Sequence, residues 1–368
     1  MDAILKVTNK YSTKSIFVKQ LIDDGFLTAE IDRNFIYISP KKTHKYYLNG
    51  LNIELTHKCN LNCVHCYGSF GQNVDHSFIN YNWFKANITN FNYLNVKTIS
   101  LTGGESTLNP DLIEIVKLIL YNGFNLCLFT NGMNYNCIYK ILECTKEYKY
   151  IIKVSLDWFE KTHNFIRGNE AAFTNSVKVI ELISQYKNID LIVSTVIMKD
   201  NEREILEFDN WFKNTFPNVK HIHDFIFPSR ENKIHCFDTS NFNDLYLRFP
   251  DLFVNNGNPR KLRCTGGISQ CTIIPNCYIK ICNSADNKIF WFEHNVFDKG
   301  LVYAWENPGK NILRFRREKA HTTKDCKLCK NMHKCKLTDC RVISYNYHKE
   351  LYRSNPITCF TVEKSIHG

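Results

Sequence analysis

The stretch Leu55–Gly68 reads LTHKCNLNCVHCYG and places three cysteines within eight residues. Cys59, Cys63 and Cys66 have the spacing C-x3-C-x2-C, and Tyr67 follows directly. A loop this short brings three sulfurs within a few ångströms of one another, so that they can surround one small inorganic centre. Because an iron–sulfur cube normally takes four protein thiolates, three cysteines leave one iron open to a ligand that is not protein.

The alternatives for this loop are a zinc knuckle and a disulfide pair. Zinc prefers four ligands, often as C-x2-C pairs, and no second pair lies nearby in the sequence. The spacing with its aromatic successor resembles the cluster loop of radical S-adenosylmethionine (SAM) enzymes, in which the amino and carboxyl groups of SAM chelate the open iron. This resemblance implies a [4Fe-4S] cluster on the three cysteines, SAM beside Tyr67, and a reductant such as flavodoxin or ferredoxin.

The composition predicts a compact protein with a second, smaller domain. Its 368 residues are 44% hydrophobic and 23% charged, which is ordinary for a globular chain. No apolar run reaches the roughly 20 residues of a membrane span, and the N-terminus lacks signal-peptide features. We therefore expect a cytoplasmic protein without a membrane partner, in which 16 cysteines indicate metal binding rather than disulfides.

The formal charge of +11 raises the question of nucleic-acid binding. Three [4Fe-4S] clusters with their thiolates would offset about five of these positive charges. The remainder suits an acidic peptide or charged cofactors at least as well as a nucleic acid. A continuous basic face would be needed for nucleic acid, and the nearest candidate, residues 314–319 (RFRREK), is expected to be a solvated helix surface.

From Leu51 onward, strand-like and helix-like segments alternate. The helix-like segments include 112–121 and 172–186. The strand-like runs are 51–55, 96–104, 124–132, 151–157, 191–198 and 221–227. Six such units predict an α/β fold, a partial (β/α)6 barrel over residues 49–258. The chemistry of such barrels lies on the loops after the strands, where the three-cysteine loop also falls.

Residues 1–48 contain no cysteine and form an N-terminal extension. Ser15–Asp24 has helical spacing, and residues 26–39 alternate like a hairpin with its turn near residues 32–34. Helix and hairpin together resemble half of a winged-helix module, which peptide-modifying radical SAM enzymes often use to hold a leader peptide. The alternative is an extension that covers one edge of the barrel.

Several strand ends resemble SAM contacts of the same family. In the family, the GGE motif after the second strand, here Gly103, Gly104 and Glu105, holds the SAM amino group. A serine on the fourth strand and the arginine of an RG pair, here Ser155 and Arg167, contact the SAM carboxylate. The same cavity is expected to be lined by Thr130, Asn131 and Asp157. For His163 we prefer a turn residue or a surface ion pair.

The C-terminal region, residues 259–368, holds nine cysteines and resembles the SPASM domain. Two departures from its pattern are visible: Cys340 follows Cys335 after four residues instead of three, and Cys277 stands where a glycine is expected. The resemblance implies two auxiliary [4Fe-4S] clusters, with a pair of zinc sites as the alternative. The ligand sets implied are Cys264, Cys282 and Cys340 with Cys271 as a fourth, and Cys326, Cys329, Cys335 and Cys359.

The function implied is that of a peptide maturase that cleaves SAM to a 5′-deoxyadenosyl radical, takes a hydrogen atom from a ribosomally made peptide, and forms a thioether or other cross-link. One alternative is a sulfatase-maturase-like oxidase, although Asn283 stands where those enzymes carry a carboxylate. Another is a peptide epimerase with Cys236 as hydrogen-atom donor. A non-catalytic metal-binding or nucleic-acid module is the alternative from another class. Cys127 is expected in the core, and Cys137 and Cys144 are expected to be incidental.

Overall fold

The computed structural model divides into two compact units, Met1–Tyr46 and Tyr47–Gly368. The structure describes residues 6–7, 27–32, 35–40, 46–71, 77–226, 235–236, 241–248, 264–317, 323–332 and 340–367. The expected boundary between residues 258 and 259 lies outside these ranges. Among the described helices, none has both the length and the apolar character needed to cross a membrane.

The N-terminal unit contains a three-stranded sheet in the order β1-β3-β2. Its strands are β1 (Lys6–Val7), β2 (Leu27–Asp32) and β3 (Phe35–Pro40). β2 and β3 pair antiparallel, with Asp32 opposite Phe35. This register confirms the predicted hairpin, while the helix predicted over Ser15–Asp24 lies outside the described residues.

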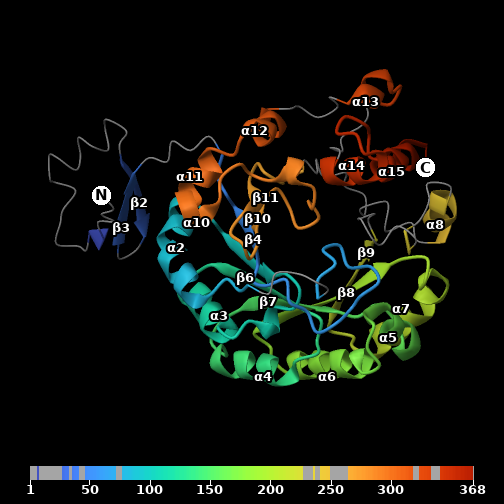
Figure 1. Cartoon of the computed structure of the whole chain (residues 1–368). Coiled ribbons are helices and arrows are strands. Elements are labelled where there is room, and N and C mark those ends of the chain that lie inside the picture. The colour runs from blue at the N-terminus through green and yellow to red at the C-terminus, as the bar shows by residue number, and fades with distance from the viewer. Residues whose placement is uncertain are drawn as a thin grey trace. The chain divides into compact units, whose positions relative to one another are not determined.

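The second unit is built on one eight-stranded sheet in the order β11-β10-β4-β5-β6-β7-β8-β9 (Figure 1). The six central strands are parallel neighbours in chain order, as predicted: β4 (Gly50–Glu54), β5 (Thr98–Thr102), β6 (Asn125–Thr130), β7 (Tyr150–Ser155), β8 (Ile189–Ile197) and β9 (Lys220–Phe225). The sheet curves but does not close, because β9 and β11 are its two edges.

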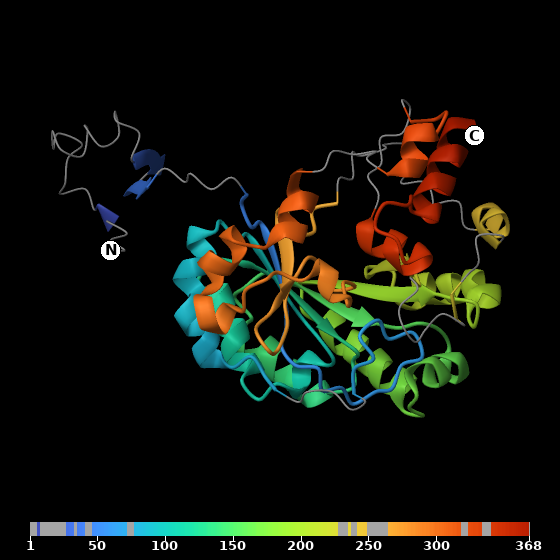
Figure 2. The same ribbon diagram turned by 45° about the horizontal axis from the view of Figure 1, so that its top comes forward.

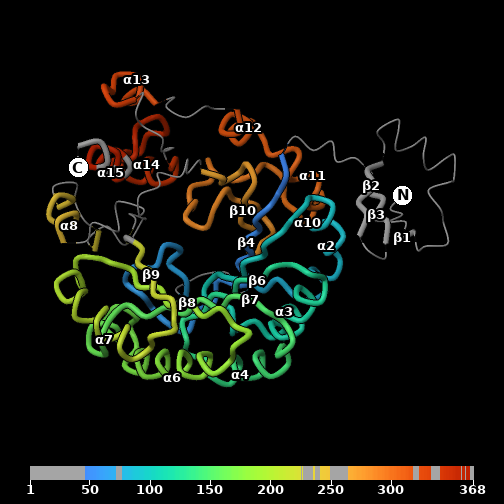
Figure 3. Tube along the Cα trace, turned by 180° about the vertical axis from the view of Figure 1, so that it is seen from behind, coloured from blue at the N-terminus to red at the C-terminus, as the bar shows by residue number. Residues whose placement is uncertain are grey.

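Helices cover the outer face of this sheet, as seen from both sides (Figures 1 and 3). They are α2 (Tyr81–Tyr93), α3 (Leu112–Tyr121), α4 (Tyr135–Cys144), α5 (Glu160–Arg167), α6 (Ala172–Ser184) and α7 (Ile205–Thr215), with α8 (Phe242–Arg248) further along the chain. α3 shows why these segments are helical: Leu112, Ile115, Val116 and Ile119 recur at helical spacing and are all buried. The sheet is therefore left open on its inner side.

The cysteine-rich region begins by extending the main sheet, which the sequence did not predict. β10 (Gln270–Ile273) pairs parallel with β4, with Cys271 opposite Leu51, and β11 (Ile279–Lys280) turns back antiparallel. Cys277 lies in the connecting turn with φ +62°. This left-handed conformation favours glycine, which accounts for the glycine that the SPASM pattern expects there.

Further helices follow the hairpin, and the first two of them lie beside α2 (Figures 1 and 2). They are α10 (Val296–Lys299), α11 (Leu301–Glu306), α12 (Lys310–Arg317), α13 (Lys324–Leu328), α14 (Arg341–His348) and α15 (Pro356–His367). α12 carries most of the basic run that was expected to be a solvated surface. That expectation is wrong for Arg316, which is 4% exposed and donates hydrogen bonds to the carbonyls of Gly267 (2.7 Å) and Trp305 (3.0 Å).

Candidate active site

One cavity of about 280 Å³ lies inside the curved sheet, where the parallel strands end. Most of the residues singled out in the sequence line it: Cys59, Cys63, Cys66, Tyr67, Gly103, Gly104, Glu105, Thr130, Asn131, Ser155 and Arg167. These residues come from five segments of the chain, which therefore meet at one place. The sequence did not single out the charged and hydroxyl groups on the β7–β9 side, which are Lys153, Ser194 and Asp224.

The two glycines after β5 let that strand's exit pack against the three-cysteine loop. The amide of Gly104 donates to Thr56 O at 2.8 Å, and the amide of Glu105 donates to Lys58 O at 2.9 Å. A Cβ on Gly104 would lie 2.2 Å from Lys58 O, and one on Gly103 would lie 2.4 Å from Thr56 O. The glycines are thus required by a close approach of two backbones, whereas the sequence suggested a close approach to a ligand.

The end of α5 holds the other side of the same loop. The amide of Asn62 donates to Arg167 O at 3.2 Å, and the amide of Val64 donates to Ile166 O at 2.9 Å. Gly168 ends the helix in the left-handed conformation, and a Cβ there would lie 2.9 Å from Asn62 O. The loop is therefore fixed on both sides by backbone hydrogen bonds.

Each thiol of the loop lies beside an N–H donor. Asn131 Nδ2 is 4.0 Å from Cys59 Sγ, Arg167 Nη1 is 3.8 Å from Cys63 Sγ, and the Phe70 amide nitrogen is 3.4 Å from Cys66 Sγ. Such donors stabilise a thiolate and hence a bound metal centre. Without metal, burial raises the pKa of Cys59 to about 12 and that of Cys63 to about 11, so metal binding must displace protons.

Glu105 holds the β5 and β6 exits together. Its Oε1 accepts hydrogen bonds from the amide (3.1 Å) and hydroxyl (2.7 Å) of Thr107 and from the hydroxyl of Thr130 (2.8 Å). Its Oε2 accepts from the amide of Asn131 at 2.8 Å. The side chain is 1% exposed, and burial raises the pKa of its carboxyl group. Glu105 is thus a positioning residue for the polar wall of the cavity.

Asp157 does not line the cavity but anchors Arg167, which does. Arg167 Nε lies 2.7 Å from Asp157 Oδ2, and both side chains are buried. Burial opposes ionisation of Asp157, but Arg167, the nearby histidines and the hydrogen bond from the Val196 amide together outweigh it and lower the pKa of the carboxyl group. His163 accepts a hydrogen bond from the Asp157 amide at 2.9 Å and is fully buried, which corrects the expected turn residue or surface ion pair.

Cys236 lies behind the cavity wall. It is 6% exposed and belongs to an apolar cluster with Ile166, Met198 and Ile226. Val196, which lines the cavity, packs against this cluster. The thiol is therefore not among the groups that form the cavity surface.

A buried charge network joins the loop to the C-terminal hairpin, and the sequence did not reveal it. Glu54 at the end of β4 places Oε1 2.8 Å from Lys280 Nζ and Oε2 2.8 Å from His57 Nε2. Lys280 also donates to Asn283 O at 2.7 Å and lies 5.8 Å from the centre of the Tyr67 ring. The only signals in the sequence were charged residues inside two apolar strands.

Three cysteines of the C-terminal region influence one another. A hydrogen bond between the Cys264 and Cys340 thiols lowers the pKa of Cys264 and raises that of Cys340, to which the charge of Cys282 adds. Burial and then the charge of Cys264 raise the pKa of Cys282. Cys271 differs, because burial raises its pKa and Arg316 is the charged group that acts on it among the described residues. The structure thus groups Cys264, Cys282 and Cys340, and it places Cys271 within β10.

The cysteines assigned to the second auxiliary set lie on α13 and α15 and in the segment between these helices. Cys326 is in α13, Cys329 ends it and Cys359 is in α15, while Cys335 lies outside the described residues. The start of α13 is tied to the chain just before α15, because Asp325 Oδ2 accepts from Arg353 Nε (2.9 Å) and from the Ser354 amide (2.8 Å). This link places the start of α13 close to the start of α15.

Comparison with known proteins agrees with this geometry. Residues 53–212 match the model of the radical SAM superfamily. The sporulation killing factor maturation protein SkfB of Bacillus subtilis is 29% identical over 154 residues, which are 42% of this chain and 37% of SkfB. The antilisterial bacteriocin subtilosin biosynthesis protein AlbA of the same organism is 30% identical over 155 residues, which are 41% of this chain and 34% of AlbA.

The chain thus spans little more than a third of the length of these two relatives. A solved structure, Streptococcus suis SuiB bound to its precursor peptide SuiA, has the same fold: the TM-score is 0.67 at 16% identity, over 85% of this chain and 76% of SuiB. The cysteine-rich C-terminal region fits a SPASM domain. Residues 53–212, which contain the three-cysteine loop at the end of the first barrel strand, thus form a radical SAM domain, and the enzymes of this superfamily use a [4Fe-4S] cluster and S-adenosylmethionine.

Proposed function

We propose that this protein is a radical SAM peptide maturase. Cys59, Cys63 and Cys66 would hold the cluster, and the donor set fits that role because three thiols flank one cavity and each has an N–H donor beside it. SAM would lie against the polar groups that complete the wall, namely Tyr67, Gly103, Gly104, Thr130, Asn131, Ser155 and Arg167. When bound, this pair supplies a 5′-deoxyadenosyl radical that takes a hydrogen atom from an unactivated carbon.

The chain's own contribution is to position these groups and to exclude water. Arg167 is held by Asp157 at 2.7 Å and extends to Cys63, so a carboxylate beside the loop meets a fixed positive charge. On the β7–β9 side, Asp224 Oδ2 lies 3.4 Å from Lys153 Nζ and accepts from the Ser194 hydroxyl at 3.2 Å. This charged wall provides the polar contacts that would orient a peptide backbone.

For the bond formed, a thioether or other cross-link is the proposal. Auxiliary clusters would take up the electron left on the product. They would be held by the group Cys264, Cys282 and Cys340 and by the set Cys326, Cys329, Cys335 and Cys359.

Two observations weaken the other peptide reactions. Cys236, the candidate donor of an epimerase, lies behind the cavity wall. The Asn283 amide, at the position of the sulfatase-maturase carboxylate, accepts a hydrogen bond from Thr272 at 2.7 Å.

The domain assignment is part of this proposal. Residues 49–258 would form the catalytic barrel, residues 259–368 the auxiliary-cluster domain, and residues 1–48 an element that holds the leader of the peptide. The names of the relatives support a peptide substrate: two are described by maturation or biosynthesis of a killing factor or bacteriocin, and SuiB was crystallised with a precursor peptide. The observation that carries the proposal is the meeting of the three-cysteine loop with the SAM-contact motifs around one cavity.

The test uses synthetic peptides encoded by short, cysteine-containing reading frames that neighbour the gene. Each is incubated anaerobically with the cluster-loaded protein, SAM and dithionite. The proposal predicts that one peptide loses two hydrogen atoms in mass for each 5′-deoxyadenosine formed, with no product from the Cys59→Ala, Cys63→Ala, Cys66→Ala variant. Release of 5′-deoxyadenosine with every peptide unchanged in mass would overturn the cross-link assignment while leaving the radical chemistry intact.

A further inference from the structure

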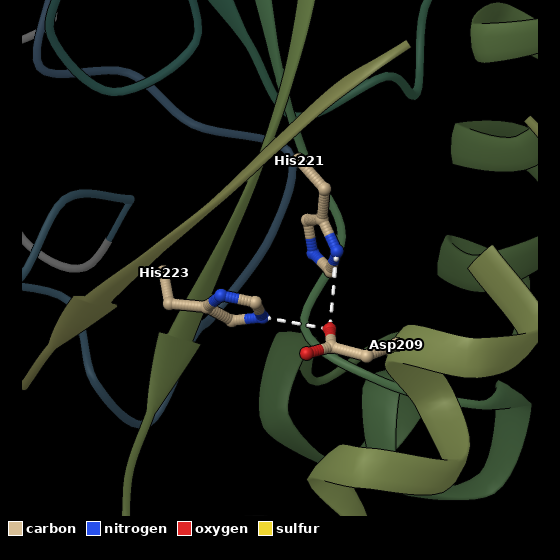
Figure 4. A group of neighbouring side chains, drawn as sticks. All are labelled: Asp209, His221 and His223. Carbon is tan, nitrogen blue, oxygen red and sulfur yellow. Dashed lines mark hydrogen bonds and ion pairs between the residues drawn. The ribbon is translucent and has the colours of Figure 1, made fainter. Parts of the chain in front are cut away.

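A second group of potential metal ligands lies outside the cavity. Asp209 of α7 faces His221 and His223 of β9 (Figure 4). The two histidines share one face of the strand because they are two residues apart. Asp224 lies on the other face and lines the cavity, whereas the His221 ring packs on Phe212 of α7 at 4.4 Å between centres. The group is therefore on the helix-covered side of the sheet.

The three side chains direct their ligand atoms at one another. Asp209 Oδ1 lies 3.2 Å from His221 Nδ1 and 2.9 Å from His223 Nε2. One ligand atom from each of the three side chains lies within 4.8 Å of the other two. Ligands that are 2.0–2.1 Å from a tetrahedral zinc ion are separated by about 3.3 Å. The two oxygen–nitrogen separations in this group, 3.2 Å and 2.9 Å, are similar to that value.

The hydrogen bonds around His221 fix which of its nitrogens is protonated. The Thr195 hydroxyl donates its proton to Leu156 O at 2.5 Å. His221 Nε2 lies 2.8 Å from the same hydroxyl oxygen and must therefore be the donor in that contact. In the neutral ring, Nδ1 is then an unprotonated acceptor.

His221 Nδ1 is thus a buried acceptor that faces a second acceptor, the Asp209 carboxylate. The His221 side chain is 6% exposed, and Nδ1 has no hydrogen-bond partner among the described residues. It lies next to the Asp209 carboxylate oxygen, so two lone pairs meet in a buried place without a hydrogen between them. A cation bound to both atoms removes this conflict, and the His223 nitrogen supplies a third ligand.

We propose that Asp209, His221 and His223 bind a divalent transition-metal ion of the zinc class. Two imidazoles and one carboxylate are a donor set that zinc uses, and the Thr195 hydroxyl orients the His221 ring as an outer hydrogen-bond partner does. The side chains of Asp209 and His223 are each 19% exposed, so water can take the fourth position. The ion fastens α7 to β9, the last strand of the sheet.

The probe is Zn²⁺, added at one equivalent to the full-length, cluster-loaded protein. X-ray absorption at the zinc edge is expected to show a nitrogen and oxygen shell at about 2.0–2.1 Å, and hydrogen exchange of residues 205–225 is expected to slow. Both signals should vanish in His221→Ala, His223→Ala. They should also vanish in His223→Gln, a milder change at a part-exposed position that guards against misfolding of the double variant.

His235→Ala is the matched control, because His235 Nδ1 also contacts a carboxylate, Asp200 Oδ2 at 2.7 Å, but His235 is not a member of the Asp209, His221 and His223 group. This variant should bind zinc as the wild type does. Zinc held in a sulfur shell at about 2.3 Å, or equal binding by the wild type and His223→Gln, would overturn the proposal. So would the absence of zinc binding, since an imidazolium–carboxylate pair would then fill the site.

Discussion

His163 shows how a single buried side chain makes stability depend on pH. Burial lowers its pKa from 6.5 to about 3, so the folded protein keeps the ring neutral and uses Nδ1 to accept the Asp157 amide proton. The unfolded chain binds a proton near pH 6.5. The stabilisation is therefore complete above pH 6.5 and is lost progressively as the pH falls from 6.5 toward 3.

We expect wild type to lose about 0.8 kcal/mol more stability than His163→Gln between pH 7.5 and pH 6, because only the wild type must keep an imidazole neutral. Glutamine can still accept the amide proton of Asp157. The measurement is urea unfolding of both proteins at the two pH values, followed by tryptophan fluorescence. Equal losses in the two proteins would show that His163 titrates alike in both states.

At the scale of elements, the site depends on the three-cysteine loop, which is hydrogen-bonded to the β5 exit on one side and to the end of α5 on the other. Gly104 is where this contact is tightest, because a Cβ there would meet the Lys58 carbonyl oxygen at 2.2 Å. Neither backbone can move without breaking the hydrogen bonds from Gly104 and Glu105 to the loop. Loop geometry, and with it cluster binding, should therefore be sensitive to one methyl group.

Gly104→Ala should fold with an unchanged far-ultraviolet circular dichroism spectrum but bind clearly less iron than the wild type, with the deficit approaching the about four irons of one cluster. Gly123→Ala is the control. Gly123 also has positive φ, +77°, but a Cβ there meets nothing within 4 Å, so that variant carries only a backbone strain of about 1–2 kcal/mol. Equal iron in the two variants would refute the role given to the close approach.

The sequence predicted those elements that are marked by a pattern of neighbouring residues. Apolar runs located all six parallel strands, and the C-x3-C-x2-C spacing located the loop. The pairing of β10 with β4 was missed because it joins Cys271 to Leu51, residues far apart in the chain, within a segment whose cysteines suggested only metal ligands. The His221 and His223 pair was visible as alternation in a strand, but no local pattern connects it to Asp209 on the preceding helix.

For the whole molecule, the Glu54–Lys280 pair connects the barrel to the C-terminal region. Both side chains are almost fully buried, with 2.8 Å between the charged atoms. Burial opposes ionisation of Glu54, but Lys280 and His57 together more than offset it and lower the pKa of the carboxyl group. Lys280 also donates to the carbonyl oxygen of Asn283, which follows Cys282 in the sequence. This one ammonium group therefore contacts a residue just before the three-cysteine loop and a residue next to Cys282.

We expect Lys280→Met to lower the free energy of unfolding by about 3–5 kcal/mol, because it leaves the Glu54 carboxylate buried without its partner. The double variant Glu54→Gln, Lys280→Met should recover most of this loss, as neither charge remains. Denaturant unfolding of both single variants and the double variant gives the coupling energy. Additive effects would show that the two side chains do not interact across the sheet.

The central claim is that Cys59, Cys63 and Cys66 hold the cluster that cleaves SAM. The measurement is iron content and 5′-deoxyadenosine release under dithionite, for anaerobically reconstituted wild type and two triple alanine variants. Replacement of Cys59, Cys63 and Cys66 should remove about four irons and abolish 5′-deoxyadenosine. Replacement of Cys127, Cys137 and Cys144 should change neither. Equal 5′-deoxyadenosine release from both variants, or zinc in place of iron in the wild type, would contradict the account.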